Sequence, residues 1–530
     1  MRRGLVRRGP VRSGGRSAQD AVVIGGGFAG LATAALLARE GHRVTLLEAQ
    51  PSLGGRAGEW KQDGFRFETG PSWFLMPEVF DHFFALCGTS TAEQLDLVRL
   101  DPAYRVFFEE AAEPFELPAT GAAAALTALS GDPHGLEKYL SSAEETYQLA
   151  VQKLLYSTYS STRSFLEPEL LTRLPKLLRL LGEPLDRFIA RHTSDERLQQ
   201  ILGYPAVFLG TSPRDAPSLY HLMSHLDINQ GVLYPKGGFS AVVNAVERIA
   251  LREGVEIRTN CRARHITGAR GRATGVHFTD EHGQRQFLQA SVVVSTADMH
   301  TTETQLLAPD HRSLKPRLWG RRDPGPSAVL GLLGVSGELP QLAHHSLLFT
   351  RDWQRGFDEI SGKRPDGGAP RSVYVCRPSA TDAVAPEGSE NLFVLIPVRA
   401  DPALGHGGTE GNGDPGVELV LDEAIEQISQ WAGIPDLAQR VTVRRSIGPA
   451  DFAQDFGAFK GGALGPAHTL RQSAFMRGPI SSSKLAGLFY AGATTMPGIG
   501  VPMCLISAEL VLKSLRSDST AGPLEAPIAR

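Results

Sequence analysis

A glycine-rich turn near the start of the chain has the residue types and the spacing of a dinucleotide-binding site. Gly25, Gly27 and Gly30 fit the pattern G-x-G-x-x-G. The first glycine permits a tight turn, the second lets the backbone approach a pyrophosphate, and the third lets a helix and a strand pack closely. A helix that starts near Phe28 and Ala29 would offer free N–H groups and a favourable dipole to the pyrophosphate.

An acidic residue stands where a dinucleotide site needs a ribose ligand. The glycines lie between an apolar strand pattern at 21–24 and a helical pattern, and a second strand pattern ends at Glu48. Glu48 follows Gly30 by 18 residues, the usual distance for an acid that accepts hydrogen bonds from ribose hydroxyls. A glycine pattern alone is weak evidence, but these flanking elements make dinucleotide binding the prediction.

A second glycine step, Gly54-Gly55-Arg56, follows the acid and brings backbone and a guanidinium towards the phosphates. The alternative interpretation is a glycine turn with a surface arginine. The step resembles the second signature of the flavin amine oxidase and phytoene desaturase superfamily, which implies FAD as the cofactor. The sequence contains no second strand–GxGxxG–helix unit. We therefore expect electrons to leave the flavin to oxygen, a quinone or another diffusing acceptor, not through an NAD(P)H domain.

Four further segments extend this resemblance along the chain. Gly70-Pro71-Ser72 looks like an element that lies beside the flavin ring, although Glu68 stands where the family usually has Asp, so its side chain is assigned no role. Two others are similar to a substrate-domain segment and to a Y-P-x-G-G turn that begins a region near the adenine. They are Tyr204–Pro213 and Leu233–Phe239.

The fourth segment, Gly487–Ala508, resembles the C-terminal flavin motif. The resemblance places Gly492 at the ribityl phosphate side and Gly500, Val501 and Pro502 along the isoalloxazine ring. Cys504 replaces a small residue there. A covalent flavin through Cys504 is one interpretation, and a buried, inert thiol beside a noncovalent flavin, the family norm, is the preferred one.

Together these segments resemble bacterial carotenoid (phytoene) desaturases of the actinobacterial type. The fold implied is α/β: a Rossmann-like FAD-binding domain with an interleaved α+β substrate domain. The FAD domain would comprise 21–75, 230–300 and 480–516, and the substrate domain 76–229 and 301–479. Residues 1–20 would form a disordered basic tail and 517–530 a flexible tail.

The activity implied is stepwise dehydrogenation of phytoene towards lycopene, with a hydride passing to flavin N5. The substrate would be phytoene or a related long polyene, held in an apolar tunnel. No catalytic acid or base is assigned. Two alternatives remain open: an amine-oxidase-like flavoenzyme, and a redox-silent, FAD-dependent carotenoid isomerase or binding protein. The chain has no Trp, Tyr or Phe after Tyr490, which argues against the aromatic surroundings of an amine substrate.

An amphipathic pattern between Leu170 and Ile189 suggests contact with an anionic membrane surface. Basic residues occupy one side of the predicted helix and apolar residues cluster within about 120° on the other. The alternative is a core-facing helix with a solvated basic face. The apolar positions are 170, 171, 174, 177, 178, 181, 185, 188 and 189. A hydrocarbon substrate implied by the resemblance favours the membrane interpretation, and hence a cytoplasmic protein peripherally associated with the cell membrane.

Composition excludes several other classes of protein. Hydrophobic residues make up 42% and charged residues 21% of the 530, close to a soluble globular average. The first twenty residues hold six Arg and one Asp, so residues 21–530 carry a net charge of −8, and nucleic-acid binding is not expected. The four cysteines lie far apart without ligand spacing, so neither a metal site nor a disulfide framework is predicted. Glycines and prolines interrupt the uncharged run before Glu509, so no transmembrane helix is expected.

Overall fold

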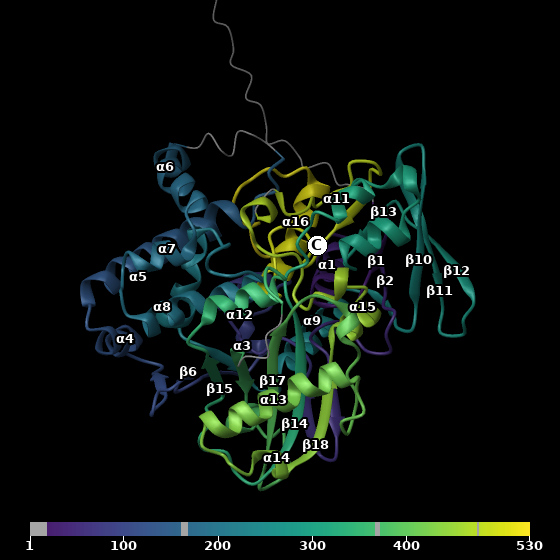
Figure 1. Cartoon of the computed structure of the whole chain (residues 1–530). Helices are drawn as coiled ribbons and strands as arrows, with labels where there is room; N and C mark the ends of the chain where they lie inside the picture. Colours follow the sequence, from purple (N-terminus) through teal and green to yellow (C-terminus); the bar gives the residue numbers. More distant parts are fainter. Residues whose placement is uncertain (1–17, 161–167, 366–370, 474–475, 530) are drawn as a thin grey trace, which may run out of the picture.

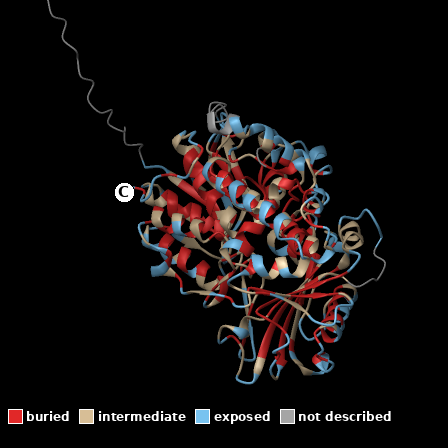
Figure 2. Cartoon of the chain, turned by 90° about the vertical axis from the view of Figure 1, so that its left-hand side faces the viewer, coloured by how far each residue is buried: buried red, intermediate tan, exposed pale blue. Residues whose placement is uncertain are grey.

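The computed structural model describes residues 18–160, 168–365, 371–473 and 476–529. Its two main sheets and one helical region are arranged around a continuous buried interior (Figures 1 and 2). Among the described residues, none of the helices combines the length and the apolar character needed to cross a bilayer.

A five-stranded parallel sheet carries the start of the chain. Its strand order is β19-β13-β1-β2-β9, and every pairing in it is parallel. Its strands are β1 (Asp20–Ile24), β2 (Arg43–Leu47), β9 (Glu256–Arg258), β13 (Val292–Ser295) and β19 (Leu488–Tyr490). Helix α1 (Phe28–Arg39) packs against α9 (Gly238–Arg252) and α16 (Val501–Arg516). Burial on both faces explains why the central strands are continuous apolar runs. Elements from both ends of the chain therefore share one core.

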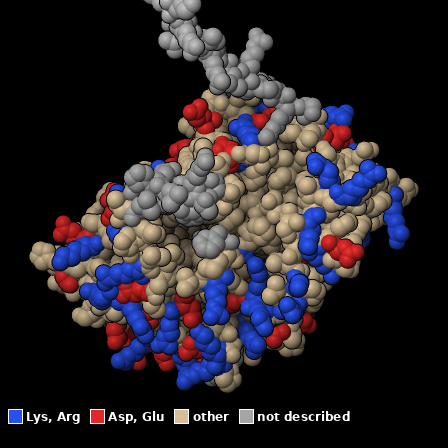
Figure 3. Space-filling model, turned by 90° about the horizontal axis from the view of Figure 1, so that it is seen from above, with Lys and Arg blue, Asp and Glu red and all other residues tan. Residues whose placement is uncertain are grey.

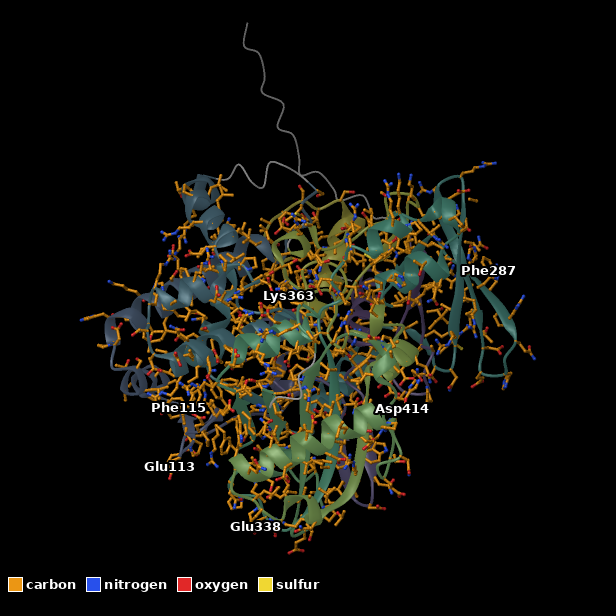
Figure 4. All side chains as sticks on the ribbon, in the orientation of Figure 1. Glu113, Phe115, Phe287, Glu338, Lys363 and Asp414 are labelled. Carbon is orange, nitrogen blue, oxygen red and sulfur yellow. The ribbon has the colours of Figure 1, made fainter. Side chains whose placement is uncertain are left out.

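A small antiparallel sheet interrupts this unit between β9 and β13. It consists of β10 (Arg262–Ala269), β11 (Arg272–Thr279) and β12 (Arg285–Gln289). The sheet projects at the right of Figure 1, and its edge strand β12 presents the half-exposed Phe287 (Figure 4).

A seven-stranded sheet forms the lower half of the molecule in Figure 1, with α13 (Pro415–Trp431) across one face. Its other face, with strand pairs that include Leu330–Leu395 and Tyr374–Leu395, turns towards the parallel sheet's cofactor edge. The strands, in spatial order, are β18 (Val441–Ile447), β14 (Ser327–Ser336), β17 (Ser389–Val398), β16 (Val373–Cys376), β15 (His345–Phe349), β6 (Tyr104–Phe108) and β7 (Phe115–Leu117).

The remaining strands form two short antiparallel pairs: β3 (Glu59–Gln62) with β4 (Phe65–Glu68), and β5 (Leu97–Arg99) with β8 (Leu233–Pro235). The other α-helices are α2 (Pro77–Leu86), α3 (Thr91–Gln94), α4 (Ala122–Ser130), α5 (Pro133–Leu149), α6 (Pro168–Gly182), α7 (Leu185–Ala190), α8 (Glu196–Gly203), α10 (Met299–Thr301), α11 (Pro316–Trp319), α12 (Trp353–Ile360), α14 (Leu437–Arg440) and α15 (Pro449–Phe456). Short 3-10 and π-helical turns include 150–154, 204–209, 218–222 and 225–230.

The amphipathic pattern expected as one helix is divided between α6 and α7. The break falls at Glu183 and Pro184, because a residue before proline is driven out of the α conformation. Leu185, Phe188 and Ile189 pack into the helical core, whereas Leu174 and Leu178 are 41% and 60% exposed. The side chains at 170 and 171 lie outside the described residues. The apolar stripe is therefore a core contact on α7 and a solvent-facing pair on α6.

The C-terminal residues differ from the flexible tail that the sequence suggested. Leu524 and Ile528 are buried in the same apolar cluster as α1 and α16. The backbone N–H of Leu524 donates to Glu509 over 2.6 Å, and that of Ile528 donates to the Leu86 carbonyl over 3.1 Å. The segment packs because its few apolar residues reach an open edge of the core. The expected basic tail at 1–20 lies almost wholly outside the described residues.

Candidate functional site

One cavity of about 1330 Å³ lies between the parallel sheet and the seven-stranded sheet. It brings together every residue that the sequence assigned to the cofactor, with the exception of Gly30. Those residues are Gly25, Gly27, Phe28, Ala29, Glu48, Gly54, Gly55, Arg56, Gly70, Pro71, Ser72, Gly492, Gly500, Val501 and Pro502. Segments more than 400 residues apart thus meet at one site, and their individual binding roles stay predictions.

The first turn has the geometry that an anion-binding site requires. Gly25 has φ of +101°, a conformation open to glycine, and α1 begins directly after Gly27 with no side chain capping its free N–H groups. The Glu48 carboxylate accepts hydrogen bonds from the backbone N–H of Gly26 at 2.5 Å and of Gln50 at 2.8 Å. These bonds fix the carboxylate at the edge of the cavity where a ribose is expected.

Gly30 lies behind the turn and serves the packing of α1. A Cβ at this position would stand 1.9 Å from the carbonyl oxygen of Gly25 and 3.1 Å from Oγ1 of Thr296. Its absence from the cavity lining agrees with the role assigned to the third glycine of the motif, close approach of helix and strand.

Arg56 is a buried cation aimed at the phosphate side of the cavity. Its Nε has no hydrogen-bond partner among the described residues, and its guanidinium lies 5.7 Å from the centre of the Phe456 ring. Burial lowers the pKa of Arg56, while Asp298 and Cys504 raise it. A buried cation with an unused donor has the chemistry to bind a phosphate.

The C-terminal segment forms the wall opposite the first turn. Gly492 has φ of +103°, and its N–H donates to Oγ of Ser507 at 2.9 Å. Gly500, with φ of +112°, precedes Pro502 in the first turn of α16. Burial raises the pKa of the Cys504 thiol to about 11, so the sulfur stays protonated and is a poor nucleophile. This supports the inert-thiol interpretation over a covalent flavin.

These residues fit FAD by the chemistry of their donors: helix N–H groups and Arg56 for the pyrophosphate, and Glu48 for a ribose. When bound, FAD supplies a two-electron acceptor that takes up hydride. On the adenine side the lining comes from Cys261–Arg264, just beyond the region that the resemblance had indicated.

The cavity continues beyond the cofactor residues as a mostly apolar space that the motifs did not reveal. One wall is the sheet face carrying Ala328, Leu330, Phe393 and Leu395. The other wall comes from the short helical turns at 150–154, 204–209, 218–222 and 225–230. Its residues include Leu154, Phe208, Leu209, Leu219, Leu222, Met223 and Leu226. These side chains come from strands and turns without a local motif, so only the expectation of an apolar tunnel anticipated them.

Comparison with known proteins identifies the relatives of this chain. The family model described as flavin containing amine oxidoreductase matches residues 28–511. The chain is 39% identical to a carotenoid 3,4-desaturase of Haloarcula japonica, over 95% of this chain and 99% of that protein. It is 32% identical to a zeta-carotene-forming phytoene desaturase of Myxococcus xanthus, over 93% of both.

Solved structures show the same fold at low identity. An oxidoreductase from Methanosarcina mazei superposes with a TM-score of 0.60 at 17% identity, covering 93% of this chain and all of that one. Putrescine oxidase bound to putrescine gives a TM-score of 0.59 at 12% identity, covering 94% of this chain and 99% of that one. The α/β fold with a Rossmann-like FAD-binding unit is thereby confirmed. With this fold, a full-length family match and relatives above 30% identity, the chain belongs to the FAD-dependent carotenoid desaturases within the flavin-containing amine oxidoreductase family.

Proposed function

We propose that the protein dehydrogenates phytoene stepwise towards lycopene in carotenoid biosynthesis. The observation that carries the proposal is the apolar cavity that continues from the cofactor residues, in a chain whose relatives are named as desaturases of phytoene and other carotenoids. A polyene hydrocarbon offers no polar handle, so the lining would bind it by apolar contact and exclude water. The chain's main contribution is to align one C–H bond for hydride removal.

A second candidate is introduction of the 3,4 double bond into a carotenoid that is already desaturated. The specific observation in its favour is the 39% identity to the carotenoid 3,4-desaturase, spanning 95% of this chain. Both candidates use the same removal of a hydride and a proton from adjacent carbons, and they differ in where along the polyene the cavity places the reacting bond.

Product analysis separates these candidates. We expect a host that makes phytoene to accumulate lycopene or a partly desaturated intermediate when it expresses the chain. If phytoene stays unchanged while a lycopene-making host gains a 3,4 double bond, the second candidate replaces the first. Anaerobic addition of phytoene to purified holoenzyme should bleach the flavin. An isomerase or binding protein would change or retain the carotenoid without bleaching, and an amine oxidase would bleach only with an amine.

We also propose that a quinone or oxygen reoxidises the flavin, because the sequence has a single dinucleotide-binding unit. Anaerobic turnover should therefore depend on an added quinone. Turnover at the same rate with NAD⁺ as the sole acceptor would contradict this.

Peripheral contact with an anionic membrane surface, for a cytoplasmic protein, is the third part of the proposal. Helices α6 and α11 lie at the upper end of the molecule in Figure 1 and carry the exposed Leu174, Leu178 and Leu318. The view of this end in Figure 3 has an area without charged side chains at its centre. Arg173 and Lys176 bind Glu145 at 2.9 and 2.6 Å, so apolar contact is expected to contribute more than charge.

A further inference from the structure

Two tyrosines of the cavity lining are hydrogen-bonded to a histidine, in a lining that is otherwise mostly apolar. Tyr374 lies on β16 with its hydroxyl 2.8 Å from Nδ1 of His345, and Tyr220 has its hydroxyl 2.6 Å from Nδ1 of His468. Binding a hydrocarbon requires neither pair. Desaturation, however, requires that a proton be taken up after hydride removal.

The hydrogen bonds of the two histidines differ in which ring nitrogen is already used. The backbone N–H of Ile499 donates to Nε2 of His468 at 3.3 Å. Nε2 therefore holds the lone pair, and in a neutral ring Nδ1 then carries the hydrogen and donates to Tyr220. Tyr220 in turn donates to Oγ of Ser473 at 3.1 Å. This pair has no free acceptor for another proton.

His345 has the opposite arrangement. Its Nε2 is buried and has no partner among the described residues, so Nδ1 is free to act as the acceptor for the Tyr374 hydroxyl. The ring is fully buried and stacks on Trp73 with centroids 4.2 Å apart. Burial and the neighbouring His344 keep the pKa of His345 well below its usual range, so the ring is neutral before the reaction. A neutral imidazole retains the lone pair that a proton acceptor needs.

Tyr374 connects this histidine to the cofactor side of the cavity. Its hydroxyl lies 2.7 Å from Oγ of Ser72, in the segment expected beside the flavin ring. On the sheet its neighbour across the strand is Leu395, which also lines the cavity. The phenol oxygen thus stands between the apolar substrate wall and a buried base.

We propose that Tyr374 is the catalytic group that removes the proton in desaturation, and that His345 is the positioning residue that receives the tyrosine's own proton. This rests on the proposed function. The hydride leaves one carbon with two electrons for the flavin. The adjacent C–H bond then breaks, and its electron pair becomes the second carbon–carbon bond. The proton binds the Tyr374 oxygen as the hydroxyl proton moves to Nδ1 of His345, and water takes the extra proton after product release.

A carbocation next to a C–H bond is a far stronger acid than an imidazolium ion, so even a base with a lowered pKa accepts its proton. A buried base of this kind also remains unprotonated at low pH, where an exposed histidine would be blocked. The arrangement therefore provides an acceptor that is available throughout the reaction cycle.

The test compares wild-type holoenzyme with Tyr374→Phe, His345→Phe and the double variant, using phytoene or lycopene, whichever the wild type converts. Phenylalanine preserves the aromatic contacts, including the stack on Trp73. We expect normal FAD content and normal carotenoid retention, with anaerobic flavin reduction slowed about 100-fold or more in each single variant. The double variant should be no slower than Tyr374→Phe, because the two residues act as one unit.

A second readout follows the proton directly. Deuterium at the carbon that loses the proton should slow Tyr374→Phe more than it slows the wild type, since proton removal becomes limiting. Tyr139→Phe is the matched control, a buried tyrosine outside the cavity lining that should match the wild type. Wild-type rates in Tyr374→Phe would overturn the inference while leaving the proposed function intact. So would additive losses in the double variant, or the isotope effect appearing in Tyr220→Phe instead.

Discussion

At the scale of single residues, two glycines of the first turn face different neighbours. A Cβ at Gly27 would meet only Gly54 and Gly55 at 3.7 and 3.9 Å, which is ordinary contact, whereas a Cβ at Gly30 would overlap the Gly25 carbonyl at 1.9 Å. We expect Gly27→Ala to keep the apoprotein's melting temperature. It should weaken FAD binding about tenfold or more, because its methyl group displaces a charge-assisted contact with the pyrophosphate.

Gly30→Ala supplies the contrast, because overpacking the turn costs about 1–3 kcal/mol of folding stability. This variant should lose melting temperature with or without flavin. Flavin titration beside thermal unfolding of the apoprotein measures both quantities. Unchanged FAD affinity in Gly27→Ala would show that the pyrophosphate does not approach this turn.

Glu68 predicts a pH dependence of stability. Its carboxylate accepts hydrogen bonds from the N–H and hydroxyl of Ser240, yet burial raises its pKa from 4.5 to about 7. Between these values the unfolded chain has released the proton and the folded chain retains it. Raising the pH from 4.5 to 7 therefore lowers the free energy of unfolding, by on the order of 3 kcal/mol.

Glu68→Gln removes this titration, so its melting temperature should fall less than that of the wild type across the same pH range. Both proteins would be measured as holoenzyme, and the difference between the two curves cancels contributions from other groups. Parallel curves would mean that Glu68 ionises normally in the folded protein.

The residues of the cofactor site were accessible from sequence because each lies in a local motif. Gly25 and Glu48 are tied to their neighbours by a strand–turn–helix geometry that spacing reveals. Tyr374 and His345 lie on antiparallel strands, and their pairing depends on strand register between segments 29 residues apart. No local pattern encodes that register, so the proton-accepting pair required the structure.

At the scale of elements, α6 shows how a stripe of apolar residues can serve two purposes. Leu177 is 8% exposed and packs with Leu149 of α5, while Leu174 and Leu178 face outwards. Spacing alone placed all of these residues on one face, because the angular pattern does not record where a helix ends or what lies beside it. Pro184 was visible as a breaker, but the burial of α7 depends on its distant partners.

The exposed pair makes the membrane proposal testable at this element. Leu174→Glu/Leu178→Glu should shift the protein from liposomes into solution. Each buried leucine side chain contributes at most about 1.5–3 kcal/mol, and the substituted glutamates add repulsion from anionic lipid. Cosedimentation with anionic liposomes measures the shift, and flavin content verifies the fold.

Leu419→Glu is the matched control for that experiment. Leu419 is 59% exposed on α13, at the opposite end of the molecule from α6 (Figure 1). This variant should cosediment as the wild type does. If the α6 variant also cosediments normally while retaining FAD, α6 is not a membrane contact.

At the scale of the whole molecule, the C-terminal segment closes the core around a buried cation. Lys513 is fully buried on α16, and its Nζ donates to the carbonyls of Tyr156, Thr520 and Gly522 at 2.6–2.8 Å. Deleting residues 518–530 removes two of these acceptors and exposes the surface covered by Leu524 and Ile528. We expect a marked fall in melting temperature, because an incompletely paired buried charge is costly.

Lys513→Met distinguishes the charge from the lost packing. In the shortened chain this substitution should recover part of the stability, since it removes the unpaired cation. Thermal unfolding of the full chain, the shortened chain and the shortened Lys513→Met chain measures the two contributions. Equal melting temperatures of the first two would show that the segment contributes nothing to the fold.

The overall architecture was partly predictable from sequence. Motifs at both ends of the chain implied one cofactor unit, and the parallel sheet joins them. The seven-stranded sheet was foreseen only as part of an α+β substrate domain. Its order places β18 beside β14 and β6 beside β15, pairings between residues more than 100 and more than 200 positions apart. Such order is decided by packing across the whole chain, which residue spacing does not express.

The parallel sheet also has a consequence for protein synthesis. Its first two strands leave the ribosome early, whereas β19 and the cofactor wall formed by the start of α16 are among the last segments to be translated. The nascent chain therefore cannot assemble the complete flavin pocket during most of its translation. Flavin capture is a late maturation event, and the cellular supply of flavin can determine how many finished polypeptides become active enzyme.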